Sequence, residues 1–221
     1  MVVWMAPQLR IDIISDIVCP WCAIGFAQLE RAIDALGDRA DVGIRWHPFQ
    51  LVPDLPQDGK SISDHMRDRY GASPEQGQSS RKRIVEAGAA LGIDFHYSDD
   101  SRIYSTFKAH QLLMWAGEQG NQTALKLALF KAYFTEQKNV SDTDVLAEIA
   151  GSVGLDPVLA RAILDEGRYA DPVSAEMDHW IDQNVTGVPA FIINGKYMIP
   201  GAQDADTFGQ IFDRILAKAA A

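Results

Sequence analysis

The chain holds two cysteines, and they stand close together in the tetrapeptide Cys19-Pro20-Trp21-Cys22. This tetrapeptide lies where a β-branched run gives way to a run with helical periodicity. In the first turn of a helix the two side chains share one face and can close a disulfide. A helix N-terminus also stabilises a thiolate at Cys19, and proline fits the first helical position. The pattern predicts a dithiol switch, with Cys19 as nucleophile and Cys22 as resolving thiol.

Two other uses of a cysteine pair are open to such a sequence. Buried cysteines serve as small apolar core residues, but such residues have no reason to flank a Pro-Trp pair at a helix start. A zinc site needs two further ligands. The histidines form no H-x₃₋₅-H pair and there is no second C-x-x-C, so we predict no metal site.

Composition excludes two broad classes of partner. Of the 221 residues, 30 are acidic and 20 are basic, whereas nucleic-acid binding needs a basic surface. No run is long and apolar enough to suggest a membrane span, so no membrane partner is expected. Because 47% of the residues are hydrophobic, we expect a globular protein, either one large domain or a smaller one that carries an insertion.

The first seven residues (MVVWMAP) are apolar but lack the basic region, the long apolar region and the cleavage site of a secretory signal. We therefore expect a cytoplasmic protein. In that compartment an isolated C-x-x-C is typically catalytic or redox-sensing rather than a structural staple. The sequence leaves a homodimer open.

Two predicted strands flank the helix that follows the cysteine pair. Residues 9–15 and 42–47 alternate as strands, and residues 20–36 repeat apolar side chains at helical spacing. Gly37 is the expected end of this helix. A strand–helix–strand unit of this size predicts that the two strands are parallel.

The middle of the chain reads as helical throughout. After a linker over residues 51–60, helices without an intervening strand are predicted over residues 63–70, 74–91, 104–119, 122–136, 141–153 and 156–166. One more helix follows Pro172. Two short strands then flank Asn194-Gly195, which supplies the positive φ angles of a hairpin turn, and a last amphipathic helix spans residues 204–218.

A second motif, Thr186-Gly187-Val188-Pro189, precedes the first hairpin strand. Together with the C-x-x-C it resembles thioredoxin-fold proteins, whose cis-proline loop lies against the cysteine pair, and among them the DsbA-like group, which carries a helical insertion. The closer resemblance is to the FrnE-like branch. It covers nearly the whole chain and rests on residues 15–22 (SDIVCPWC), 46–51 (WHPFQL), 109–113 (AHQLL), 186–191 (TGVPAF) and 200–203 (PGAQ).

The resemblance implies a fold class and a domain organisation. The fold is expected to be α/β, a thioredoxin-like fold with an inserted all-helical subdomain. The thioredoxin-like domain is expected to be discontinuous, over residues 8–60 and 170–221. The helical insertion is expected over residues 61–169.

The resemblance also implies the main site residues. Cys19 is the attacking thiol, Cys22 is the resolving thiol, and Pro189 is the cis-proline. A cis bond between Val188 and Pro189 leaves the backbone groups of Val188 free to pair with an extended substrate beside Cys19.

The remaining candidates each have two interpretations. Pro20 and Trp21 lie between the cysteines, where Trp21 either contacts substrate or packs on its neighbours. His110 falls on a predicted helix, where it either lines a cleft at the site or is a structural histidine. Asp16 is expected to cap the active-site helix rather than to tune the thiols. His47 is expected at a strand end rather than in catalysis.

The predicted activity is that of a protein-disulfide oxidoreductase acting on protein or small-molecule thiols and disulfides. It needs no cofactor, and glutathione stays open as a redox partner or co-substrate. The alternative is a glutathione-dependent isomerase or transferase of the kappa or 2-hydroxychromene-2-carboxylate isomerase type, which has a similar fold. Serine typically replaces the first cysteine there, so intact Cys19 and Cys22 favour redox chemistry. A non-catalytic binding module is a third interpretation and predicts no raised thiol reactivity.

Overall fold

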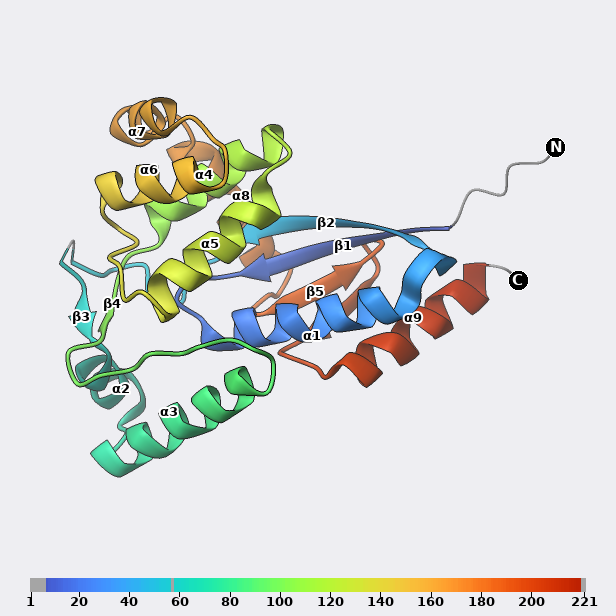
Figure 1. Ribbon diagram of the computed structural model, residues 1–221, viewed down its shortest axis with the longest axis horizontal. Coiled ribbons are helices and arrows are strands. Elements are labelled where there is room, and N and C mark those ends of the chain that lie inside the picture. Colours follow the sequence, from blue (N-terminus) through green and yellow to red (C-terminus); the bar gives the residue numbers. More distant parts are fainter. Residues whose placement is uncertain (1–6, 57, 220–221) are drawn as a thin grey trace.

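A computed structural model describes residues 7–56 and 58–219 and shows a four-stranded sheet with helices around it (Figure 1). Nearly all of the N-terminal segment that was predicted to lack a secretory signal lies outside the described residues, as does residue 57 of the predicted linker. No helix within the described part of the chain combines the length and the apolar character that a membrane span requires.

The sheet joins strands from both ends of the chain. In sheet order its strands are β2 (Asp41–Pro48), β1 (Gln8–Ser15), β5 (Ala190–Ile193) and β6 (Tyr197–Pro200). The pairing of β1 with β2 is parallel, which confirms the predicted strand–helix–strand unit, whereas β5 and β6 pair antiparallel. The hairpin turn is also confirmed, because Asn194 and Gly195 both have positive φ angles.

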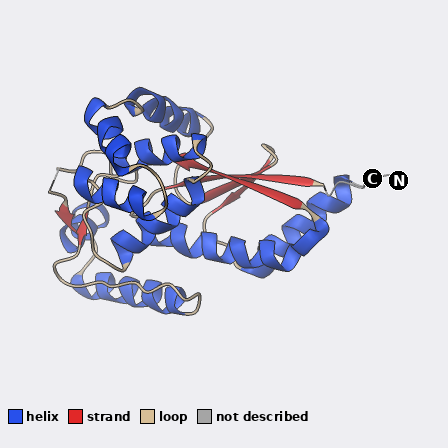
Figure 2. Ribbon diagram, turned by 45° about the horizontal axis from the view of Figure 1, so that its top comes forward, coloured by secondary structure: helices blue, strands red, loops and turns tan. Residues whose placement is uncertain are grey.

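Helices cover both faces of the sheet and gather at one of its ends. In chain order they are α1 (Pro20–Leu36), α2 (Ile62–Tyr70), α3 (Pro74–Ala89), α4 (Phe107–Glu118), α5 (Gln122–Phe134), α6 (Thr143–Ser152), α7 (Pro157–Glu166), α8 (Ala170–Asp182) and α9 (Ala205–Ala219). The short 3₁₀ helix η1 (Gly37–Arg39) follows α1. Helices α1 and α9 pack side by side, while α4, α5 and α8 contact β2 (Figures 1 and 2).

The helical middle of the chain contains one strand pairing that the sequence prediction missed. Strand β3 (Lys60–Ser61) pairs antiparallel with β4 (Arg102–Ile103), so the prediction of helices without an intervening strand is corrected here. The Arg102 guanidinium supports this pairing, because it donates to the carbonyls of Asp58 and Gly59, each at 2.8 Å. A two-residue ladder is too short to leave a periodic pattern in the sequence.

Helix α8 begins before the proline that was expected to precede it. It starts at Ala170 and contains Pro172 in its first turn. The first four N–H groups of a helix have no intrahelical partner, so a proline there removes no hydrogen bond.

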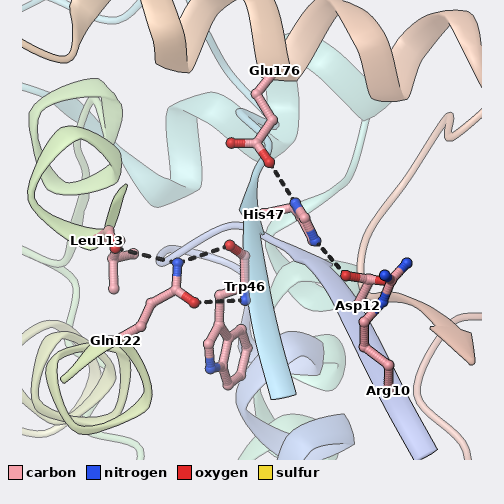
Figure 3. Close-up of polar contacts among 7 residues, drawn as sticks. All are labelled: Arg10, Asp12, Trp46, His47, Leu113, Gln122 and Glu176. Atoms are coloured by element: carbon pink, nitrogen blue, oxygen red, sulfur yellow. Dashed lines mark hydrogen bonds and ion pairs between the residues drawn. The ribbon is translucent and has the colours of Figure 1, made fainter. Parts of the chain in front are cut away.

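A buried histidine links the sheet to α8 (Figure 3). His47 lies next to the last residue of β2, as expected, with Nε2 at 3.0 Å from Asp12 Oδ1 and Nδ1 at 2.5 Å from Glu176 Oε1. The second oxygen of Asp12 accepts from Arg10 Nε at 3.0 Å. His47 therefore joins β1, β2 and α8 through charge-assisted hydrogen bonds.

A side-chain amide covers part of the edge of β2 (Figure 3). Gln122, the first residue of α5, accepts from the Trp46 N–H at 2.9 Å and donates to the Trp46 carbonyl at 2.9 Å. Its Nε2 also lies 3.2 Å from the Leu113 carbonyl on α4. The amide thus makes the pair of hydrogen bonds that a neighbouring strand would make, and it fixes the start of α5 against Trp46.

We expect His47→Leu to destabilise the fold, because the Glu176 carboxylate loses its donor and the buried Asp12 carboxylate keeps only Arg10. Loss of one member of a buried charged group costs about 3–5 kcal/mol, and the partial exposure of Glu176 lowers the expected loss to about 2–4 kcal/mol. Urea unfolding measures this free energy. The exposed neighbour provides the control, since Arg45→Ala should change it by about 0.5 kcal/mol or less. Wild-type stability in His47→Leu would show that the link carries no net stabilisation.

Candidate active site

The cysteine pair forms the first turn of α1. Cys19 is the N-cap residue, with φ −91° and ψ 109°, and Pro20 is the first helical residue, as predicted. The Cys22 N–H donates to the Cys19 carbonyl at 3.0 Å, and no side chain caps this helix end. The sulfurs of Cys19 and Cys22 therefore lie where the unpaired N–H groups of a helix start favour negative charge.

Both cysteines are in the free thiol form and buried, with Cys19 4% exposed and Cys22 1% exposed. The Cys19 thiol donates to the Val188 carbonyl at 3.6 Å, and the peptide bond between Val188 and Pro189 is cis. The Gly201 N–H donates to the Pro189 carbonyl at 2.8 Å, which attaches this loop to the end of β6. The structure thus brings together the two cysteines and the proline loop, although they are far apart in the sequence.

A glycine in α1 allows the helix to lie close to the strand that follows the proline loop. A Cβ atom added at Gly25 would come within 3.2 Å of Phe191 on β5 and within 3.2 Å of the Ala202 Cβ. Both distances are tighter than ordinary van der Waals contact, so a larger residue would push α1 away from β5. The small residue therefore helps to keep Cys19 beside Val188.

The residues between the cysteines lie at the surface. Trp21 is 42% exposed, which leaves much of its indole ring accessible beside the cysteine pair, and Pro20 is half-buried. An exposed aromatic ring beside a reactive sulfur offers an apolar contact area. The predicted role of Pro20 and Trp21 in substrate contact stays a prediction.

Asp16 and His110 form a buried polar pair near the cysteines. Asp16 Oδ2 accepts from the Leu51 N–H at 2.8 Å, and its Oδ1 lies 3.5 Å from His110 Nε2. His110 Nε2 also donates to the Phe49 carbonyl at 3.0 Å. The Asp16 carboxylate does not cap α1, which corrects the sequence prediction, because it bonds instead to the chain that follows β2. His110 has a structural contact there, and its predicted contact with substrate stays a prediction.

The surroundings keep Asp16 in its charged form and His110 in its neutral form. Burial alone would raise the pKa of Asp16, but His110 and the Leu51 N–H lower it below its ordinary value. Burial lowers the pKa of His110, against the opposing attraction of Asp16. At neutral pH the site therefore holds a carboxylate beside a neutral imidazole.

The two thiols interact too strongly to titrate independently. The hydrogen bond to Cys22 and burial raise the pKa of Cys19 well above its ordinary value. Burial would raise the pKa of Cys22 as well, but the hydrogen bond from Cys19 and the positive charge of Lys126 lower it. The reduced pair therefore titrates as one coupled unit. The predicted thiolate on Cys19 stays a prediction.

Lys126 is a site residue that the sequence prediction missed. It lies on α5 and is 1% exposed, and burial lowers its pKa to about 8 against the attraction of Cys22, Asp16 and Cys19. A signal was present, since Lys126 is the only charged residue between Glu118 and Lys131. Within residues 7–56 and 58–219 no three His, Cys, Asp or Glu residues are grouped to hold a metal ion.

Known proteins resemble this chain in sequence and in fold. A family model of the DSBA-like thioredoxin domain matches residues 10–213. A crystal structure of a probable DsbA oxidoreductase from Streptomyces coelicolor is 34% identical, with a TM-score of 0.87 over 93% of this chain and 89% of that chain.

Two more distant solved structures share the fold alone. A 2-hydroxychromene-2-carboxylate isomerase is 15% identical, with a TM-score of 0.73 over 96% of this chain and 98% of that chain. The cytosolic disulfide reductase DsbM from Pseudomonas aeruginosa, solved with GSH, is 16% identical, with a TM-score of 0.63 over 94% of this chain and 99% of that chain.

The neutral state of His110 predicts a loss of stability in mild acid. Its folded pKa lies below the ordinary value of 6.5, so as the pH falls below about 6.5 the unfolded chain takes up a proton before the folded chain does. His110→Gln keeps an N–H donor for the Phe49 carbonyl but does not titrate. We therefore expect the wild-type free energy of unfolding to fall more steeply between pH 6.5 and 5, by up to about 1.4 kcal/mol per pH unit.

Urea unfolding at several pH values measures this difference. The control is His179→Gln at an exposed position, which should keep the steeper wild-type dependence. Equal slopes for the wild type and His110→Gln would contradict the assignment of a neutral, buried His110.

Proposed function

Because the chain belongs to the DsbA-like thioredoxin family of thiol–disulfide oxidoreductases, we propose that Cys19 and Cys22 are its redox-active pair. The observation that carries the proposal is the Cys19 thiol at the start of α1, 3.6 Å from the Val188 carbonyl and in contact with a second buried thiol. The substrates are thiols and disulfides of proteins or small molecules. The dithiol itself supplies the electrons, so the chemistry needs no cofactor.

The first step places the charge on the outer sulfur. The reduced pair loses one proton to solvent, which leaves a thiolate on Cys19 at the start of α1 while Cys22 keeps its proton. This thiolate attacks one sulfur of a substrate disulfide; the new S–S bond forms as the old one breaks, and its electron pair leaves with the other substrate sulfur. The product is a mixed disulfide between Cys19 and the substrate.

The second step closes the pair. Cys22 loses its proton, and its thiolate attacks the Cys19 sulfur of the mixed disulfide. The Cys19–Cys22 disulfide forms, and the remaining substrate sulfur leaves as a thiolate. The substrate disulfide has gained two electrons and the pair has lost two. The reverse sequence oxidises a substrate dithiol.

The substrate is proposed to bind as an extended segment beside the proline loop. A substrate N–H replaces the Cys19 thiol as the donor to the Val188 carbonyl, while Pro189 presents no N–H of its own. Trp21 and Pro20 provide the apolar contact on the other side of the sulfur. Main-chain recognition of this kind suits substrates of varied sequence.

Three finer assignments belong to the same proposal. Membership of the FrnE-like branch is supported by the sequence segments that carry the resemblance. A cytoplasmic setting, with glutathione as a small-molecule thiol partner, is supported by the name of DsbM as a cytosolic disulfide reductase and by the GSH in its structure. The domain division, with residues 8–60 and 170–221 around an insertion over residues 61–169, is supported by the sheet strands at both ends of the chain.

Trapping of the mixed disulfide tests the proposal. In Cys22→Ser the serine hydroxyl does not attack sulfur, so the reaction should stop after the first step and covalent adducts with substrate should accumulate. In Cys19→Ser the remaining thiol is 1% exposed, so we expect at least a tenfold smaller yield of adducts. Non-reducing gels and mass spectrometry, with and without dithiothreitol, measure the adducts.

The same experiment separates the alternative function. A glutathione-dependent isomerase or transferase forms no obligatory mixed disulfide with a protein. Full activity in Cys22→Ser, without any adduct that dithiothreitol releases, would support that function and overturn the redox proposal.

A further inference from the structure

A lysine is buried near the cysteine pair without a carboxylate partner. Among the described residues Lys126 is the only lysine in the buried class, at 1% exposure, and none of the ion pairs found there involves it. Its Nζ lies 5.2 Å from the centroid of the Trp46 ring and 4.9 Å from that of the Phe130 ring. Burial of an ammonium group is costly unless an opposite charge compensates it. We therefore expect a negatively charged group other than a paired carboxylate near Lys126.

The attachment of the start of α5 to β2 fixes the position of Lys126. Gln122 is fixed to the backbone of Trp46 by two hydrogen bonds, and Lys126 and Phe130 follow at intervals of four residues on the same helix. Residues four apart share a helix face, so Gln122, Lys126 and Phe130 all face Trp46. The two hydrogen bonds between Gln122 and Trp46 therefore fix the position of the ammonium group beside β2.

Trp46 connects this lysine to the cysteine helix. The Trp46 ring packs against Phe26 at 4.8 Å between centroids, and Phe26 lies one turn after Cys22 on α1. Of the negative groups that attract the Lys126 ammonium, Cys22 is the strongest, ahead of Asp16. Asp16 already has the Leu51 N–H as a donor. Cys22 is thus the group whose charge Lys126 compensates best.

The other side of Lys126 faces a cavity of about 640 Å³ between β2, α4 and α5. His110 also reaches this cavity, and the other charged or titratable groups along its wall are Arg45, His47, Glu118 and Glu176. The titratable groups that interact with Lys126 from inside the protein are Asp16, Cys19, Cys22 and His110. Lys126 therefore stands between the thiols and a space large enough for water.

We propose that Lys126 is the charge partner of the resolving thiol: its amine takes the proton of Cys22 when the mixed disulfide is resolved and then releases it to water in the cavity. This inference rests on the proposed function. The Cys22 S–H bond breaks, an N–H bond forms on Lys126, and the Cys22 thiolate attacks the Cys19 sulfur. The substrate thiolate leaves, and the ammonium returns to the amine by giving its proton to solvent.

Neutral replacement of the lysine tests the proposal. Lys126→Met removes the charge and keeps most of the length of the side chain, and Lys126→Gln does the same with a polar end. The control is Lys131→Met on the same helix, whose side chain is 70% exposed. Circular dichroism checks that each variant is folded.

Two measurements separate an electrostatic role from a structural one. In a Cys19→Ser background, absorbance at 240 nm titrates Cys22 alone, and we expect its midpoint to rise by at least about one pH unit in both Lys126 variants, which is a tenfold change in ionisation. With Cys19 intact, rapid-quench mass spectrometry follows the mixed disulfide. Its formation should be nearly unchanged, whereas its resolution at pH 7 should be at least tenfold slower. Lys131→Met should match the wild type in both.

The wild-type chain provides a test that needs no variant at position 126. The rate of resolution should rise with pH and level off above about 8, where the Lys126 amine is neutral. A rate independent of pH between 6 and 9 would overturn the inference, and so would wild-type resolution with an unshifted Cys22 titration in folded Lys126→Met. Failure of the proposed function is distinct from these results, because the wild type would then form neither a mixed disulfide nor a Cys19–Cys22 bond.

Discussion

Negative charge on two buried sulfurs is the constraint on which the rest of the site depends. Cys19 and Cys22 are 4% and 1% exposed, so water solvates a thiolate there poorly, and the protein must supply the compensation. The first turn of α1 supplies unpaired N–H groups, and Lys126 supplies a full positive charge. The Asp16 carboxylate adds a second negative charge to the same interior, where the Leu51 N–H stabilises it.

The groups around the thiols come from segments that only the complete fold brings together. Helix α1 carries the cysteines, the loop before β5 carries Val188, and α4 and α5 carry His110 and Lys126. The Gln122 amide joins α5 to the backbone of Trp46, and His47 joins β2 to α8. The helices that gather at the end of the sheet (Figure 1) therefore contribute charged and polar groups, His110 and Lys126, to the surroundings of the cysteine pair.

Local patterns predicted most of the secondary structure, whereas contacts between distant segments were beyond them. The parallel β1–β2 pair and the Asn194-Gly195 turn follow from periodicity and turn chemistry. Asp16 was misread as a helix cap because capping is local, whereas its partner Leu51 is 35 residues away. Lys126 was missed because its neighbours lie on β2 and α1, and helical periodicity alone does not show that such a position is fully buried.

The redox equilibrium of the cysteine pair with glutathione tests the central claim most directly. The protein is equilibrated at pH 7 with mixtures of reduced and oxidised glutathione, then alkylated and weighed by mass spectrometry. We predict that Cys19 and Cys22 become protected together, in a single two-electron transition, by an intramolecular disulfide that dithiothreitol opens. The account would be contradicted if both thiols stayed open to alkylation in every mixture, or if each acquired glutathione independently without forming a bond to the other.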